Sequence, residues 1–200
     1  MVNPPDVKDF TRMLDVNTLG HVRVTRMFLP LIRMSKGRVV IMSSITCRLV
    51  AKNFSSYTMS KAAITKFTDV LRSEVAMFGV KVIGIEPWGA KTPMILKGVG
   101  KEGFIKAWNS DTPQEVKDAY GQRYYEQFQR MYAKSTDSSS LLEPQQVVDE
   151  VVDAVMSPEP DVVYRVVPVH IDWIIWFVFE FLPQDLRPHV ISILERLQGH

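Results

Sequence analysis

The chain has 200 residues, 46% hydrophobic and 23% charged, which is ordinary for one globular domain with a sizeable core. A formal net charge of +2 with scattered basic residues gives no reason to expect a nucleic-acid partner. The single cysteine excludes an internal disulfide framework, and the four histidines lack metal-ligand spacing, so we expect no metal. The first residues show no signal-peptide pattern, and we expect an intracellular protein.

Residues 6–35 are predicted to form a helix, because apolar side chains recur along one stripe at helical spacing. Pro30 lies inside this pattern and is expected to kink the helix, since an interior proline costs about 3 kcal/mol unless a bend is wanted. Asn17 lies on the apolar stripe. General burial favours an amide that is bonded to the backbone there, and a functional role depends on the rest of the site.

Residues 38–43 form an apolar, β-branched run that ends in Ser43 and Ser44. This predicts a buried parallel strand with hydroxyl groups at its carboxyl end, where open α/β sheets place their sites. In the following loop, we interpret Cys47 as a small buried or half-buried thiol rather than a reactive one. The glycosylation sequon at residues 53–55 is interpreted as a chance match.

Residues 57–78 are predicted to form a helix of about six turns, at ~3.6 residues per turn. Tyr57 and Lys61 are four residues apart, so they share one helix face, one turn apart. A phenol, an ammonium and a serine hydroxyl that converge at a strand end are the outline of a proton-transfer site.

A second buried strand is predicted at residues 80–85, with a loop at 87–93 on its carboxyl side. Residues 94–140, here called the cover segment, are expected to lie over a substrate. Their strongest element is a helix at 113–134 with an aromatic stripe that either packs on the body or forms an apolar lid. The stripe consists of Tyr120, Tyr124, Tyr125, Phe128 and Tyr132.

A helix at residues 144–156 and a third strand at 162–167 precede an apolar tail, residues 168–200. Within the tail, residues 171–182 are mostly large and apolar, but a membrane-spanning helix needs about 20 residues. We therefore expect this stretch not to span. Three alternatives remain open: contact with a membrane interface, burial in a dimer interface, or a position over the substrate site.

The order of the polar residues resembles a known signature. Ser44 is followed thirteen residues later by Tyr57, and Lys61 comes after three more residues. Together with Asn17 upstream, this set resembles the short-chain dehydrogenase/reductase family. Two further segments are similar to the branch that holds retinol, hydroxysteroid and hydroxybutyrate dehydrogenases: residues 39–44 and 79–87.

The resemblance implies an α/β fold, a partial Rossmann-like, doubly wound parallel sheet flanked by helices, in a single domain over residues 1–200. It implies NAD or NADP as cofactor and a small or lipophilic alcohol or ketone as substrate. It also implies a homo-oligomer formed through the helices at 6–35 and 57–78. Membrane association, at the endoplasmic reticulum or the mitochondrion, would require contact through residues 171–182.

The same resemblance assigns roles to the polar residues. Tyr57 would be the general acid and base, and Lys61 would favour its phenolate form by roughly 3 kcal/mol at about 5 Å and an effective dielectric of about 20. Lys61 would also bind the nicotinamide ribose. Ser44 would hold the substrate oxygen, with Ser43 as the alternative, and Asn17 would anchor a water relay to Lys61.

The loop after the second strand matches the family in part. Pro87, Gly89 and Thr92 stand where the family places residues that contact the cofactor. Trp88 stands where a glycine is usual, and we expect its side chain to crowd the approach of a nicotinamide.

The glycine-rich phosphate loop of a dinucleotide fold does not occur in this sequence. At ~30 residues per strand-helix-strand unit, we expect about 80 to 90 residues of the family's fold to be missing. The strand at 38–43 would then have a bare edge. Such an edge is expected to make the chain poorly stable, or to pair with another chain.

Two functions follow from these observations. The first is an NAD(P)-dependent oxidoreductase that acts on a hydroxybutyrate-, retinoid- or steroid-type substrate. The second is a catalytically impaired dehydrogenase that serves as an interaction or membrane-associated protein. A serine hydrolase built on Ser44 is disfavoured, because no Gly-x-Ser-x-Gly elbow surrounds this serine.

Overall fold

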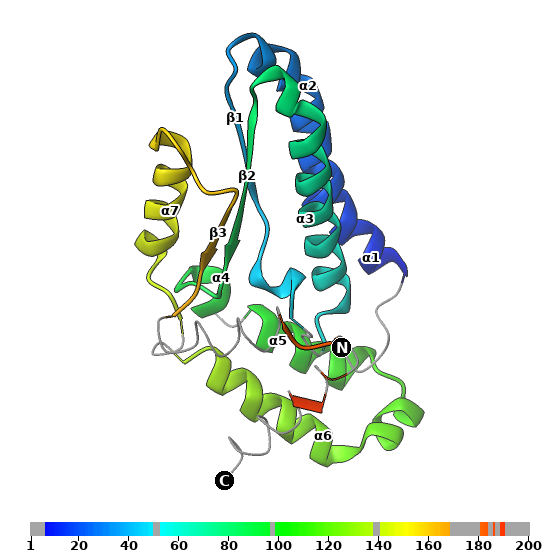
Figure 1. Cartoon of the computed structure of the whole chain (residues 1–200). Coiled ribbons are helices and arrows are strands. Elements are labelled where there is room, and N and C mark those ends of the chain that lie inside the picture. The colour runs from blue at the N-terminus through cyan, green and yellow to red at the C-terminus, as the bar shows by residue number, and fades with distance from the viewer. Residues whose placement is uncertain are drawn as a thin grey trace.

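The computed structural model describes residues 7–49, 53–96, 99–137, 141–168, 181–183, 186 and 189–190. A parallel sheet lies between two layers of helices, with further helices below the carboxyl ends of the strands (Figure 1). The sheet has the order β1-β2-β3. Its strands are β1 (Arg38–Met42), β2 (Lys81–Pro87) and β3 (Val163–Val166). The predicted α/β class is confirmed.

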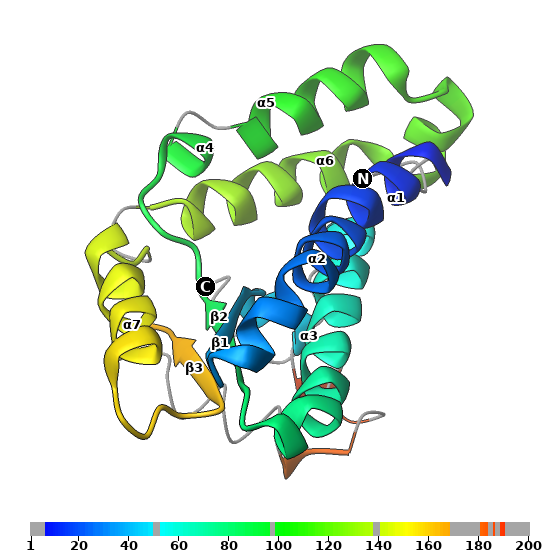
Figure 2. The ribbon, with the colours of Figure 1, turned by 90° about the horizontal axis from the view of Figure 1, so that it is seen from above.

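One face of the sheet is covered by the helices that carry most of the predicted site, and Figure 2 shows them opposite α7. The predicted helix at 6–35 is divided by a π-helical turn. Its parts are α1 (Val7–Leu14), the π-helical turn η1 (Asp15–Leu19) and α2 (Gly20–Met34). Beside them lies α3 (Ser55–Val75), extended by a 3-10 turn η3 (Ala76–Phe78) that Gly79 ends at a φ of 73°.

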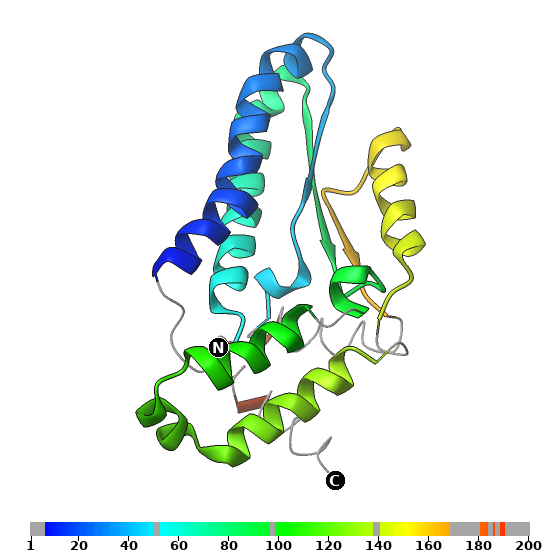
Figure 3. The ribbon, with the colours of Figure 1, turned by 180° about the vertical axis from the view of Figure 1, so that it is seen from behind.

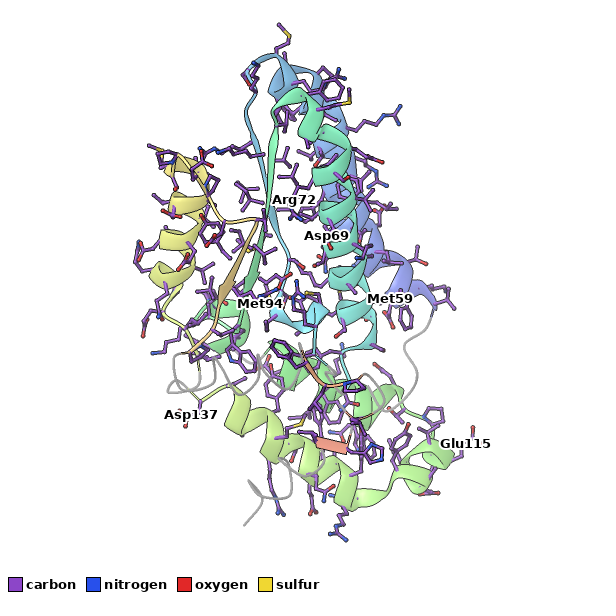
Figure 4. The ribbon with its side chains drawn as sticks, in the orientation of Figure 1. Met59, Asp69, Arg72, Met94, Glu115 and Asp137 are labelled. Carbon is purple, nitrogen blue, oxygen red and sulfur yellow. The ribbon has the colours of Figure 1, made fainter. Side chains whose placement is uncertain are left out.

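Apolar side chains fill the space between the sheet and α3. Ile41 from β1 and Ile64 from α3 are buried in one cluster with Val82 of β2. At the edge of this core, Arg72 points from α3 toward the strands (Figure 4), where its guanidinium donates to the Val82 and Val162 carbonyls at 2.7 and 3.0 Å. Apolar burial and one arginine thus fix α3 on the sheet.

The opposite face is covered by α7 (Pro144–Met156). Its amino end carries a capping box with Glu143, which satisfies free N–H groups of the first turn. Its carboxyl end is held by Arg38 of β1, which donates to the carbonyls of Ala154 and Ser157 at 2.9 and 2.5 Å. A cation at this end also complements the helix dipole.

The cover segment lies below the strands (Figure 3) and contains α4 (Pro93–Leu96), α5 (Val99–Lys106), a π-helical turn η4 (Ala107–Asp111) and α6 (Gln114–Ser135). Figure 4 places Glu115 and Asp137 near opposite ends of α6. The aromatic stripe packs mainly within this segment rather than on the sheet. Rings of α6 meet Phe104 and Trp108, and the centroids of Trp108 and Tyr125 are 5.1 Å apart. The cover segment therefore has a small core of its own.

The predicted strands and the helices at 57–78, 113–134 and 144–156 are confirmed within one to two residues at most ends. α2 continues through Pro30 to Met34, and the irregular stretch lies instead at η1. Among the described residues, no helix is long and apolar enough to cross a membrane. Of the apolar stretch at 171–182, residues 171–180 lie outside the described part of the chain.

Candidate active site

The site is built where β1 ends and α3 begins, at the end of the sheet that faces the cover segment (Figure 1). Tyr57 lies in the first turn of α3 and Lys61 one turn later. The Lys61 side chain is only 8% exposed, and its Nζ lies 5.8 Å from the centroid of the Tyr57 ring. Nζ also donates to the carbonyl of Met42, the last residue of β1, at 3.2 Å. The structure thus brings the phenol and the ammonium together at the strand end.

Burial sets the charge behaviour of this lysine. Removal from water lowers the pKa of Lys61, and the neighbouring Cys47 partly opposes the shift. The pKa of His21 is also lowered, first by its own burial and then by the positive charge of Lys61. His21 lies one turn after Asn17 on the helix that faces α3. Because its pKa is lowered, a neutral imidazole is favoured beside the Lys61 ammonium.

Asn17 lies in the π-helical turn η1, a type of bulge that is frequent at functional sites. Its Nδ2 donates to the Ser60 hydroxyl at 3.1 Å and to the sulfur of Met13 at 3.0 Å. The Ser60 hydroxyl in turn donates to the Tyr57 carbonyl at 2.7 Å. The amide is therefore joined to the helix that carries Tyr57 and Lys61, rather than to its own backbone.

The two serines after β1 have different surroundings. The Ser43 hydroxyl lies 3.2 Å from the Lys61 carbonyl, to which it donates, and 2.6 Å from the Thr65 hydroxyl. Ser43 thus fastens β1 to α3. Ser44 is the amino cap of a 3-10 turn, η2 (Ile45–Cys47). Its hydroxyl oxygen accepts from the Thr46 N–H at 3.3 Å and from the Thr46 hydroxyl at 3.0 Å. Both of these bonds use Ser44 Oγ as the acceptor.

The segment from Pro87 to Thr92 follows the neighbouring strand and ends at the same edge of the sheet. The Trp88 ring packs against the core cluster on the α7 side, and the backbone N–H of Trp88 donates to the Val166 carbonyl at 2.8 Å. A Cβ added at Gly89 would lie 3.0 Å from the Leu141 side chain, so this close approach favours glycine. Trp88 is thus accommodated by the core.

Two polar residues of the site were missed by sequence reasoning. Ser60 is fully buried, and its carbonyl accepts from the Thr18 hydroxyl at 2.9 Å. Ser60 and Thr18 are both small residues in helical patterns. The signal that the sequence gives for their role is that Ser60 directly precedes Lys61 and Thr18 directly follows Asn17. Within the described ranges, no group of three or more His, Cys, Asp or Glu residues is arranged to hold a metal ion.

Comparison with known proteins shows which protein family this sequence resembles. The family model described as short chain dehydrogenase matches residues 3–103. The chain is 40% identical over 139 residues to retinol dehydrogenase 16 of Homo sapiens, which covers 68% of this chain and 43% of that protein. It is 32% identical over 200 residues to the 3beta-hydroxysteroid dehydrogenase dhs-16 of Caenorhabditis elegans, covering 92% and 51%. The chain thus spans about half the length of the curated relatives it matches.

Solved structures share the fold. A short-chain dehydrogenase from Burkholderia cenocepacia J2315, in complex with NADP, superposes with a TM-score of 0.59 at 18% identity, covering 90% of this chain and 58% of that one. With the family model and the relatives, this confirms the predicted Rossmann-like fold and the retinol and hydroxysteroid dehydrogenase branch. The chain belongs to the short-chain dehydrogenase family.

Proposed function

We propose that this chain carries the proton-transfer site of an NAD(P)-dependent oxidoreductase that interconverts an alcohol and a carbonyl. The observation that carries the proposal is the buried Lys61 ammonium beside the Tyr57 ring at the end of β1. A buried charge is costly unless its surroundings or a ligand repay it. Functional sites are where such perturbed groups are concentrated, and family membership supports the same reaction class.

Each residue then has a role that its contacts support. Tyr57 exchanges a proton with the substrate oxygen, and the Lys61 charge favours the phenolate in that exchange. The Ser44 oxygen already accepts two bonds, so its own proton is available to hold the substrate oxygen. Asn17 positions α3 through Ser60 and anchors the relay to Lys61.

The residues present fit the nicotinamide end of a dinucleotide. Among the described residues, the hydrogen-bond acceptor of Lys61 Nζ is the Met42 carbonyl, which leaves N–H donors for a ribose hydroxyl. The Pro87, Gly89 and Thr92 positions would complete the contact from the neighbouring strand. These residues would hold the nicotinamide end, and the cofactor would supply hydride transfer between an alcohol and a carbonyl.

We infer that the substrate is lipophilic, of the retinoid or steroid type, with hydroxybutyrate as the smaller alternative. The names of the relatives support the first two classes. The aromatic core of the cover segment supports them too, because this segment lies below the strand ends (Figure 3).

The replacement Tyr57→Phe tests the proposal. In a chain that turns over, loss of the hydroxyl should lower kcat by about 100-fold or more, because general acid-base catalysis typically contributes that much. Affinity for NAD(H) should change little. Tyr120→Phe, on the exposed side of α6, is the matched control and should keep kcat. Turnover near normal in Tyr57→Phe would remove this residue from the mechanism.

A second candidate function is a catalytically impaired interaction protein. For these 200 residues taken alone, it is favoured because they contain no glycine-rich phosphate loop. Titration of NADH and NADPH, followed through tryptophan fluorescence, separates the two. Saturable binding supports the oxidoreductase, and a flat titration supports the impaired protein.

We also propose two contacts. Self-association through α2 and α3 is supported by exposed apolar residues on both helices, such as Leu31 and Val70.

Membrane-surface contact through 171–182 is supported by the composition of that stretch. Sedimentation with anionic vesicles, compared with a chain that ends at residue 168, tests the second.

A further inference from the structure

One carboxylate is buried in the sheet near the carboxyl ends of the strands, where the candidate site lies. Glu86 lies near the end of β2 and is only 1% exposed. An ionised carboxylate in such a place is retained only when it is paired and hydrogen-bonded. The groups that pair with Glu86 therefore show what this residue holds together.

Two arginines from separate segments meet this carboxylate. Arg48 approaches with both arms of its fork, Nε at 2.6 Å from Oε2 and Nη2 at 3.0 Å from Oε1. Arg165 of β3 adds Nε at 3.4 Å from Oε2. Bidentate pairs of this kind fix geometry as well as charge. We call Glu86, Arg48 and Arg165 the carboxylate clamp.

The clamp fastens the turn that begins at Ser44. This turn, η2, has Ser44 as its amino cap and Arg48 as its carboxyl cap, whose N–H donates to the Ile45 carbonyl at 3.0 Å. The far end of the turn is thus tied to β2 through Glu86. The same carboxylate directly precedes the segment that begins at Pro87.

We propose that Glu86 is a positioning residue, which acts through Arg48 to hold the Ser44 turn at the carboxyl edge of the sheet. The inference rests on the proposed function of Ser44, but the order of the turn is measurable without turnover. Loss of the clamp frees η2 to open locally while the rest of the sheet stays folded.

Cys47 is the reporter, because it is the single thiol of the chain and lies inside η2. Burial raises its pKa and the Glu86 charge raises it further, while hydrogen bonds with Thr65 and Ser43 and the Arg48 charge lower it. Alkylation rates are therefore compared on the high-pH plateau, where the thiol is fully ionised. The variant is Glu86→Gln, and Arg48→Lys keeps the charge but loses the fork. The control is Glu159→Gln, at a 93% exposed side chain paired with Lys81.

We expect Glu86→Gln and Arg48→Lys to speed alkylation by roughly tenfold or more, and Glu159→Gln to change it less than about twofold. The alkylation rate of these two variants should change little with low concentrations of urea, because a local opening of η2 exposes little surface. An unchanged rate, or one that rises with urea as steeply as global unfolding does, would overturn the clamp. Where the wild type binds NADH and turns over, kcat should fall in Glu86→Gln while NADH affinity is kept. A wild type that binds no NADH would refute the proposed function and leave the alkylation result to decide on the clamp.

Discussion

Lys61 illustrates how a functional residue is held at a cost to stability. Its ammonium is buried, and burial lowers its pKa relative to the unfolded value of 10.5. The unfolded chain then binds this proton more tightly than the folded chain does. The free energy of unfolding is accordingly reduced at every pH below the folded pKa, and it rises as the pH increases from that pKa toward 10.5.

Lys61→Met should therefore stabilise the chain while it removes the site. We expect the free energy of unfolding at neutral pH to increase by about 1 kcal/mol, because an apolar side chain replaces a buried charge. The rise of stability at alkaline pH should also disappear. Lys66→Met, at a side chain that is 77% exposed, is the control and should change stability by less than about 0.5 kcal/mol. Urea denaturation over a pH series measures both, and a less stable Lys61→Met would contradict the argument.

The contrast between Asn17 and Glu86 shows what sequence reasoning reaches. The place of Asn17 on an apolar stripe, together with the motif, predicts its role, whereas the sequence does not predict its partner Ser60. The sequence gives one signal for Glu86 within the segment 79–87, which is a charge next to buried apolar strand residues. Its partners, Arg48 and Arg165, are 38 and 79 residues away in sequence, so only tertiary structure reveals the pairing.

The strands and most helices were predictable because hydrophobic period follows burial directly. The two interruptions were not. The turn η1 depends on contacts with α3, where Thr18 and Asn17 both bond to Ser60. The break in α6 occurs at Gly121, with φ 75° and ψ 162°, inside a stretch whose other residues favour a helix. Local propensity is overridden by tertiary packing at both places.

The contact between η1 and α3 can be tested at Ser60. Ser60→Ala removes the acceptor of Asn17 and the donor to the Tyr57 carbonyl. The half-buried Asn17 amide then loses a partner, and we expect a destabilisation of about 1 to 3 kcal/mol. Ser73→Ala, on the exposed side of the same helix, should be nearly neutral. Urea denaturation compares the two, and equal effects would remove Ser60 from its role as the link.

The break in α6 can be tested at Gly121. A Cβ there would meet no atom within 4 Å, so a side chain is opposed only by backbone conformation. That conformation is essentially restricted to glycine, and Gly121→Ala should cost about 1 to 3 kcal/mol. Gly20→Ala, at a helical glycine where the nearest atom to a Cβ is 3.5 Å away, is the control and should be neutral or stabilising. Near-ultraviolet circular dichroism of the aromatic cluster around Trp108 reports the loss of packing in Gly121→Ala. An unchanged spectrum with unchanged stability would contradict this prediction.

The edge of the sheet at β1 is the feature from which we predict how the chain behaves in solution. In the described part of the chain, β1 pairs with β2 alone, so the N–H and carbonyl groups on its other edge have no strand partner. An open groove of about 510 Å³ lies between this strand and α2, and most of its lining is apolar. Val24 and Phe28 of α2, which line it, are 60% and 50% exposed. An apolar groove beside a bare edge favours association over a stable monomer.

We therefore expect the isolated chain to associate with itself or to melt without cooperativity. Val24→Lys places a charge in the groove and should weaken self-association by about tenfold or more, since a charge in an apolar contact must be desolvated without a partner. Val152→Lys, at a 52% exposed valine of α7, is the matched control and should leave association unchanged. Sedimentation velocity over a concentration series gives the association constants, and thermal melting gives the cooperativity. A wild-type chain that sediments as a monodisperse monomer and melts in one sharp transition would show that the edge and the groove carry no such cost.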